Sequence, residues 1–485
     1  MIKKTTSALC AILVCAGLIP CGNSTTISEP NQQKSNQVLR VITEETVSDG
    51  MNLIAKHLAN QFMTDNPDVT IQIDILPVDQ DERTAYLEEL EKDSKNGTGP
   101  DLYLLPTLDT LTTEEPKVYS YHRVKPVFLD VQLAMAQGKF QDISMLYDAD
   151  KELEKNLLNP YIMESGVVDG ARYVIPLRYN MPVLYCDKDA VSGIDPEIFK
   201  SSFDQWMDYV LSSGSPELAY GAEYPSTNIF PELVDYSTGE VTLTSDLVDA
   251  YLTYFQQIEA LVGAETRHRS ATSIEGYILG TETNFPVKVG KLNQALDYIA
   301  VAAAEGRNIE IYPIRTFSGD TIANVLYYAA IDANSQNTEL AYAFLRLFLS
   351  EDAQWDTIRN TNLENSSYGL LEQGWPVRSI GSVSPLWMRC KERITALFSG
   401  ITETTGSVEA ERYQIISELS LNEGNLPILS VEPYRIRYSN PGIHEFNALV
   451  YGLNDPKTGA MGSYKHMAQS EAFVASLKDM YADEK

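Results

Sequence analysis

The chain has 485 residues, with 37 basic and 67 acidic side chains and a formal net charge of −30 at pH 7. This acidity argues against nucleic-acid binding, because a phosphate backbone requires a basic surface. The length is sufficient for two or three domains, and the charge favours solubility beside an anionic cell surface.

The first 20 residues have the pattern of a secretion signal. Lys3 and Lys4 precede an apolar run that ends at Ile19, which is too short to cross a bilayer as a permanent helix. The run leads into Cys21, and this arrangement resembles the lipobox of bacterial lipoproteins, although Pro20 stands where a small residue is usual. The resemblance implies a signal peptide over 1–20, with lipid on Cys21 and an extracytoplasmic chain anchored to the cell membrane. Cys15 is the alternative lipidation position, and plain secretion with an incidental cysteine is the alternative reading.

A polar segment follows the signal. Residues 22–36 contain almost no apolar side chains, so we expect a flexible tether over 21–36. Cys186 and Cys390 are the cysteines left beyond the signal and Cys21, and two such distant residues do not make a disulfide framework. We expect both to be buried thiols.

From residue 37 the sequence predicts alternating strands and helices. Residues 37–42 predict a buried strand, and the next helix carries one apolar face formed by Met51, Ile54, Ala55, Leu58 and Phe62. A strand over 69–76, a helix over 86–95 and a strand over 100–105 continue the pattern. Such alternation is typical of a parallel sheet covered by helices.

The second half of the chain repeats this alternation. We predict a strand at 183–185, a helix over 203–211, a strand over 325–331 and a helix over 338–349. The pattern after residue 388 is mainly helical.

Four segments carry a resemblance to a known family. They are Leu39 to Ile42 with the helix that follows, Gly99 to Leu102, Tyr173 to Pro176 with Val183 to Asp189, and Asp332 to Gln354. In this order, behind a lipobox, they resemble the family 1 extracellular solute-binding proteins of ABC importers, specifically the carbohydrate-binding branch. Cys186 and Asp187 replace the usual Tyr-Asn of that family.

The resemblance implies an α/β chain with a two-lobe, periplasmic-binding-protein-like fold of class II. We expect chain crossings between the lobes near residues 177–183 and 312–318. The expected segments are lobe 1 at 37–180, lobe 2 at 181–312, a return to lobe 1 at 313–365, and a mainly helical C-terminal segment at 366–485 that packs on lobe 2.

The family binds its solute between the lobes, and its sugar-binding groups follow the proline that corresponds to Pro176. Sugars present apolar faces and hydroxyls, which aromatic, amide, carboxylate and guanidinium groups bind. The first candidates are therefore Arg178, Tyr179 and Asn180, with an interlobe ion pair as the alternative role of Arg178. Further candidates follow the first strand or lie in loops of the second lobe: Glu44, Glu45, Glu223, Tyr224, Asn228, Asn284 and Phe285.

Catalytic and cofactor motifs are missing from the sequence. It contains no P-loop, no G-x-G-x-x-G and no C-x-x-C, and the five histidines lack metal-ligand spacing. We therefore expect no cofactor, no metal and no enzymatic activity. The resulting hypothesis is a monomeric, lipid-anchored binding protein that delivers a sugar or oligosaccharide to the permease subunits of an ABC importer. A surface-anchored carbohydrate-active enzyme or an adhesin is the alternative.

Overall fold

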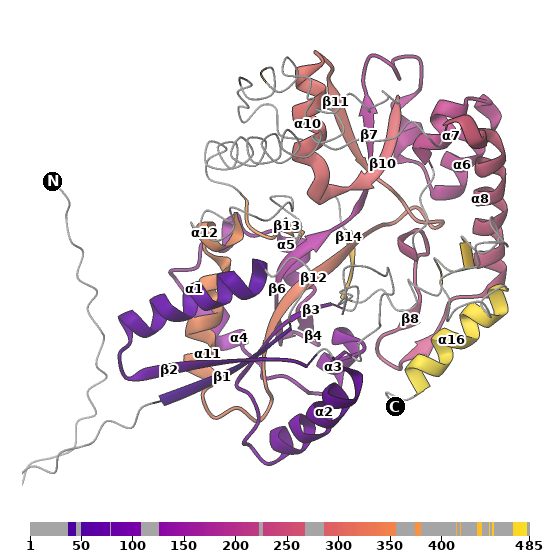
Figure 1. Ribbon diagram of the computed structural model, residues 1–485. Helices are drawn as coiled ribbons and strands as arrows, with labels where there is room; N and C mark the ends of the chain where they lie inside the picture. Colours follow the sequence, from indigo (N-terminus) through magenta and orange to yellow (C-terminus); the bar gives the residue numbers. More distant parts are fainter. Residues whose placement is uncertain are drawn as a thin grey trace, which may run out of the picture. The chain divides into compact units, whose positions relative to one another are not determined.

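Figure 1 shows the computed structural model of the chain. It describes residues 37–44, 50–77, 79–107, 126–222, 227–266, 286–355, 374–379, 434–438 and 469–482, together with Gln414, Glu418, Phe446, Leu449 and Val450. The expected signal peptide, the tether, Cys21 and Cys390 lie outside these residues. Within the described residues no helix is both long and apolar enough to span a membrane.

The larger sheet contains seven strands among the described residues. Its principal strands are β1 (Gln37–Thr43), β2 (Val69–Ile75), β3 (Leu102–Pro106), β6 (Val174–Asn180) and β12 (Thr321–Ile331). Strand β1 pairs in parallel with β2 and β3, whereas β12 pairs antiparallel with both β3 and β6. Strands β1, β2, β3 and β6 therefore share one direction. Their carboxyl ends, together with the start of β12, form what we call the carboxyl edge.

The helices of this part follow the predicted alternation. Helix α1 (Gly50–Asp65) connects β1 to β2, α2 (Gln80–Lys95) leads to β3, and α11 (Thr338–Leu345) follows β12. The predicted apolar face of α1 is buried. Helix α2 begins six residues earlier than predicted, because the Asp79 carboxylate accepts hydrogen bonds from the backbone of Asp81 and Glu82 and so caps a polar first turn. The predicted helix over 338–349 is an α-helix only as far as Leu345, where α11 ends. Residues Arg346 to Leu349 form a 3₁₀ turn, η6.

A second sheet is built from three antiparallel strands. Strand β7 (Pro182–Asp187) lies between β10 (Val287–Lys291) and β11 (Ile309–Pro313). It has its own hydrophobic core, which includes side chains of α6 (Phe203–Ser213), α7 (Pro216–Ala222) and α8 (Ser245–Thr266). Trp206 of α6 is part of this second core.

The chain passes between the two sheets at the two predicted places. Strand β6 ends at Asn180 in the larger sheet and β7 begins at Pro182 in the smaller one, so Met181 alone separates them. The return runs from the end of β11 at Pro313 to the start of β12 at Thr321. Two sheets and two crossings make up the expected two-lobe α/β architecture. The second core covers one face of the smaller sheet, whereas Val183 and Tyr185 on the other face of β7 pack in the first core.

The described parts of the C-terminal segment lie beside both sheets. Strand β13 (Trp375–Pro376) pairs with β6, and β14 (Tyr434–Arg437) pairs in parallel with the start of β12. Helix α16 (Ser470–Ala482) packs in the second core through Phe473, Leu477 and Tyr481. The segment thus contributes to both cores. Two strands of two and four residues are too short to show a period in the sequence, which is why the prediction missed them.

Short elements complete the described part of the chain. They are α3 (Val131–Ala136), α4 (Ser144–Ala149), η1 (Lys155–Leu157), α5 (Pro160–Glu164), β4 (Val167–Val168), β5 (Ala171–Arg172), η2 (Pro196–Lys200), η3 (Thr227–Ile229), β8 (Val234–Asp235), β9 (Glu240–Val241), η5 (Leu292–Gln294), α10 (Ala295–Ala304) and α12 (Glu351–Gln354).

Candidate functional site

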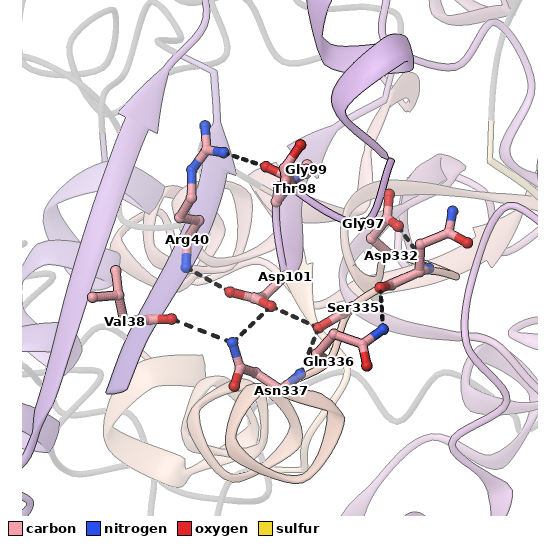
Figure 2. Close-up of a pocket in the computed structure, with 12 residues that line it drawn as sticks. Val38, Arg40, Gly97, Thr98, Gly99, Asp101, Asp332, Ser335, Gln336 and Asn337 are labelled. Atoms are coloured by element: carbon pink, nitrogen blue, oxygen red, sulfur yellow. Dashed lines mark hydrogen bonds between the residues drawn. The ribbon is translucent and has the colours of Figure 1, made fainter. Parts of the chain in front are cut away.

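A pocket of about 200 Å³ lies where β1 and β3 begin and β12 ends (Figure 2). At its centre the Asp101 carboxylate accepts hydrogen bonds from the backbone of Arg40 (2.9 Å), from Ser335 Oγ (2.7 Å) and from Asn337 Nδ2 (3.1 Å). Figure 2 shows these groups pointing toward one another. Three of the four segments that carry the family resemblance therefore meet here, and their hydrogen bonds hold the strand ends together.

Asp332 extends this network on the other side of the pocket. Its carboxylate accepts hydrogen bonds from Ser94 Oγ and from the Tyr103 hydroxyl, each at 2.7 Å. Burial and the adjacent Asp332 carboxylate raise the pKa of Tyr103 well above its usual value, so this hydroxyl keeps its proton. Because the polar groups bond to one another, and because the pocket lies opposite the carboxyl edge, we assign it a structural role.

The carboxyl edge is the better candidate for a site. In open α/β sheets, ligands bind outside the carboxyl ends of the strands. Val325 of β12 is paired with Tyr179 of β6, so Asn324 and Asn180 follow at this edge on neighbouring strands. Both crossings between the sheets begin or end here.

Glu44 follows β1 at this edge and forms an ion pair with Arg83. Its carboxylate lies 3.0 Å from the guanidinium of Arg83, which is fully buried, and Glu44 itself is 7% exposed. Asn52 fixes the local backbone, because its Nδ2 donates to the Glu44 carbonyl (3.1 Å) and its Oδ1 accepts from Thr43 Oγ1 (2.7 Å). Burial raises the pKa of Glu44, and the nearby Arg83 charge opposes this only in part.

Arg178 is bonded to backbone carbonyl oxygens of the larger lobe. Its guanidinium donates to the carbonyl oxygens of Ala353 (2.9 Å) and Gln354 at the end of α12. The Gln354 side chain returns a hydrogen bond to the carbonyl of Leu177 (3.2 Å) and accepts one from the backbone of Val377 (2.9 Å). Arg178 thus fastens β6 to α12 and β13.

Tyr179 and Asn180 are both buried in this arrangement. Tyr179 is 5% exposed and belongs to the first hydrophobic core. Asn180 donates from Nδ2 to Asn293 Oδ1 (2.9 Å), and its own Oδ1 accepts from the backbone of Met181 (3.0 Å) and of Asn293 (3.3 Å). Neither side chain is therefore exposed for direct contact with a solute in this arrangement.

Asn228 lies in η3, beside the second core, and reaches the larger sheet. Its Oδ1 accepts a hydrogen bond from Asn324 Nδ2 at 2.9 Å. Sequence reasoning missed Asn324, although an asparagine inside the apolar run from Ile322 to Ile331 is a signal that could have drawn attention to it. It also missed Arg437 of β14, whose guanidinium donates to the carbonyls of Thr227 (3.4 Å) and Phe230 (3.1 Å).

The structure thus brings Glu44, Asn180 and Asn228 to one edge, with Arg178 and Tyr179 immediately before it on β6. The other predicted contacts, Glu45, Glu223, Tyr224, Asn284 and Phe285, lie outside the described residues. Among the residues that the structure describes, no group of three histidine, cysteine, aspartate or glutamate side chains could hold a metal ion.

Comparisons with known proteins give structural likenesses only. No protein-family model matches the chain, and no curated protein matches its sequence. A family 1 extracellular solute-binding protein from Alicyclobacillus acidocaldarius has 14% identity and a TM-score of 0.46, covering 92% of this chain and 98% of that one. The galacto-N-biose/lacto-N-biose I-binding protein from Bifidobacterium longum has 15% identity and a TM-score of 0.44, covering 92% and 98%.

A designed cysteine esterase is also similar, with 11% identity and a TM-score of 0.46 over 92% of this chain and 99% of that one. The family that the sequence resembles is therefore represented among the similar structures. At these identities and TM-scores, the likeness assigns neither a ligand nor a reaction to this chain, because one fold serves many functions.

Proposed function

We propose that this protein is a lipid-anchored extracellular substrate-binding protein that captures a solute, a sugar or an oligosaccharide, and delivers it to an ABC importer. One observation carries the proposal: the chain crosses twice between two sheets, and both crossings lie at the carboxyl edge of the larger sheet. Two parts joined in this way can close around a ligand by hinge motion.

The side chains at the edge favour a neutral, hydroxyl-rich solute. Asn180, Asn228, Asn293 and Asn324 are neutral amides, each of which can both donate and accept a hydrogen bond. The nearby Glu44 charge is paired with Arg83, and Arg437 is engaged by backbone carbonyls. We expect Asn180 and Asn228 to contact the solute, whereas contact through Arg178 or Tyr179 requires these side chains to leave their present partners.

The signal and tether support the location of this activity. A lipid on Cys21 anchors the chain to the outer face of the cell membrane, and the tether of residues 22–36 lets the folded part extend away from the membrane surface. The partners are then the permease subunits of the importer, and the protein acts as a monomer.

A solute screen tests the function. The chain without its signal is melted in the presence of lacto-N-biose, maltotriose and mannotriose, and each mixture is analysed for products. We expect one class of solute to raise the melting temperature without being changed. A solute at 100 times its Kd stabilises the folded state by about 2.7 kcal/mol, which is easily measured. Turnover of a stabilising sugar would instead favour the carbohydrate-active enzyme.

A further inference from the structure

Asn324 links the larger sheet to the chain around the second core. It lies on β12, and its Nδ2 donates to Oδ1 of Asn228 at 2.9 Å. Asn228 is the middle residue of η3, and the next two residues, Ile229 and Phe230, are fully buried in the second core. This neutral hydrogen bond therefore links the larger sheet to a turn whose next residues pack in the second core.

Arg437 reinforces this link from the strand beside it. Strand β14 pairs with β12 so that Arg437 lies opposite Asn324. Its guanidinium donates to the carbonyl oxygens of Thr227 and Phe230, on either side of Asn228. The returning crossing adds a third contact, because the backbone of Phe317 donates to the Ile229 carbonyl (2.9 Å). The short turn η3 is thus held from the side of the larger sheet.

The hydrogen bonding of Asn324 is incomplete. Its side chain is 8% exposed, and its buried Oδ1 has no hydrogen-bond partner in the part of the chain that the structure describes. A neutral hydrogen bond favours an equilibrium by about two- to tenfold, and a buried acceptor without a donor costs at least as much. The link between Asn324 and Asn228 therefore cannot hold the two parts together by itself.

At the other crossing, Asn180 pairs with Asn293, and the hydrogen bonding of the Asn180 side chain is complete. Asn180 bonds to Asn293 through both of its side-chain groups and also accepts from the backbone of Met181. Asn293 directly follows Leu292, whose backbone donates to the Met181 carbonyl (3.0 Å) beside the paired strands β7 and β10. Asn180 therefore has no unpaired acceptor, unlike Asn324.

We propose that Asn324 and Asn228 form a reversible clasp that the solute completes. The clasp is this pair of amides, and opening it also requires the Arg437 guanidinium to leave the carbonyls of Thr227 and Phe230. When a hydroxyl or N–H group of the solute donates to Asn324 Oδ1, the unpaired acceptor is satisfied and the arrangement with the clasp closed gains population. This inference rests on the proposed function, and it names Asn324 as the residue that couples solute binding to the approach of the two parts.

A cross-link tests the clasp without any solute. In an Asn228→Cys/Asn324→Cys variant, we expect a disulfide to form under mild oxidation, and we expect its radius of gyration in X-ray scattering to differ from that of the reduced variant. The chain without these substitutions controls for Cys186 and Cys390. Equal radii for the oxidised and reduced forms would mean a permanent contact and would overturn the proposal.

A pair of alanine variants tests the role of the solute. Asn324→Ala should lower the affinity for the solute that stabilises the unsubstituted chain by about 5- to 30-fold, with a small change in the melting temperature of the free protein. The matched control is Asn337→Ala, which removes amide bonds to Val38 and Asp101 beyond the other end of the same strand. It should lower the melting temperature and leave the affinity unchanged.

The two arms separate the possible failures. If Asn324→Ala behaves like Asn337→Ala, Asn324 is structural and the clasp is wrong although solute binding stands. If none of lacto-N-biose, maltotriose and mannotriose stabilises the unsubstituted chain, the carbohydrate-binding function fails, and so does completion of the clasp by such a solute. The scattering experiment then still decides whether the contact between Asn228 and Asn324 is reversible.

Discussion

Tyr179 lies at the end of β6, between Val325 of β12 and Trp375 of β13. The sequence places it at a crossing, between two polar residues, which is where the family resemblance implies a sugar platform. In the structure it is 5% exposed and packs in the first core. A buried aromatic side chain stabilises the fold mainly through the apolar area that it removes from water.

Tyr179→Ala should therefore lower the free energy of unfolding of the free protein by about 3–5 kcal/mol, because it opens a cavity in the first core. Urea unfolding monitored by circular dichroism measures this change. A variant that keeps the stability of the parent chain but loses solute affinity would show that Tyr179 serves as a binding platform instead.

The Glu44–Arg83 pair gives a second prediction at the residue scale. Arg83→Leu leaves the Glu44 carboxylate buried without its partner, which should destabilise the protein by about 3–5 kcal/mol at pH 8. The pKa of Glu44 is already raised by burial, and losing Arg83 raises it further. A group whose pKa is raised on folding takes up a proton more readily in the folded state, so the loss of stability should shrink as the pH falls from 8 to 5.

Denaturant unfolding of Arg83→Leu at pH 5 and pH 8 measures that difference. The double variant Glu44→Gln/Arg83→Leu is the control, because it has no carboxylate to titrate at this position. It should regain part of the stability at pH 8 and lose the pH dependence. An equal loss for the single variant at both pH values would contradict the assignment.

At the scale of elements, the pocket network explains why the segment Gly99 to Leu102 and the start of the segment Asp332 to Gln354 lie far from the candidate site. Asp101 precedes β3, and it is bonded both to β1 and to the loop between β12 and α11. Such a residue fixes the register of three elements at the edge opposite the crossings. Its sequence motif therefore indicates the fold rather than the ligand.

Asp101→Ala should lower the free energy of unfolding by about 3 kcal/mol, because it removes a buried carboxylate that accepts three hydrogen bonds. Solute affinity measured by calorimetry should stay within about twofold, since the network lies away from the carboxyl edge. A large loss of affinity in a stable Asp101→Ala protein would move the site to the pocket of Figure 2.

At the scale of the whole molecule, the proposed anchor can be tested independently of the ligand. Cys21→Ala removes the residue that would carry lipid, so the variant should leave the membrane fraction and appear in the culture medium. Immunoblotting of both fractions measures this. Cys15→Ala is the matched control and should stay with the membrane, whereas its release in place of Cys21→Ala would assign the lipid to the other cysteine.

The sequence by itself determined the local parts of this protein. The apolar face of α1 and the strands near 37–42, 69–76 and 325–331 follow from patterns within a few residues of one another. The family resemblance and these local patterns together placed the two crossings, and Arg178, Tyr179 and Asn180 at one of them. They could not show that Arg178 bonds to α12 or that Tyr179 is buried, because those neighbours are distant in the chain.

Only the tertiary structure decided which polar groups share the carboxyl edge. Asn324 meets Asn228 across 96 positions of sequence, and β14 joins β12 across more than a hundred. Hydrogen-bond partners of this kind have no sequence period, and a strand of four residues gives no periodic signal of its own. The clasp depends on Asn324 Oδ1, which is buried without a hydrogen-bond partner among the described residues. Tertiary packing buries this oxygen, whereas Nδ2 of the same amide bonds to Asn228.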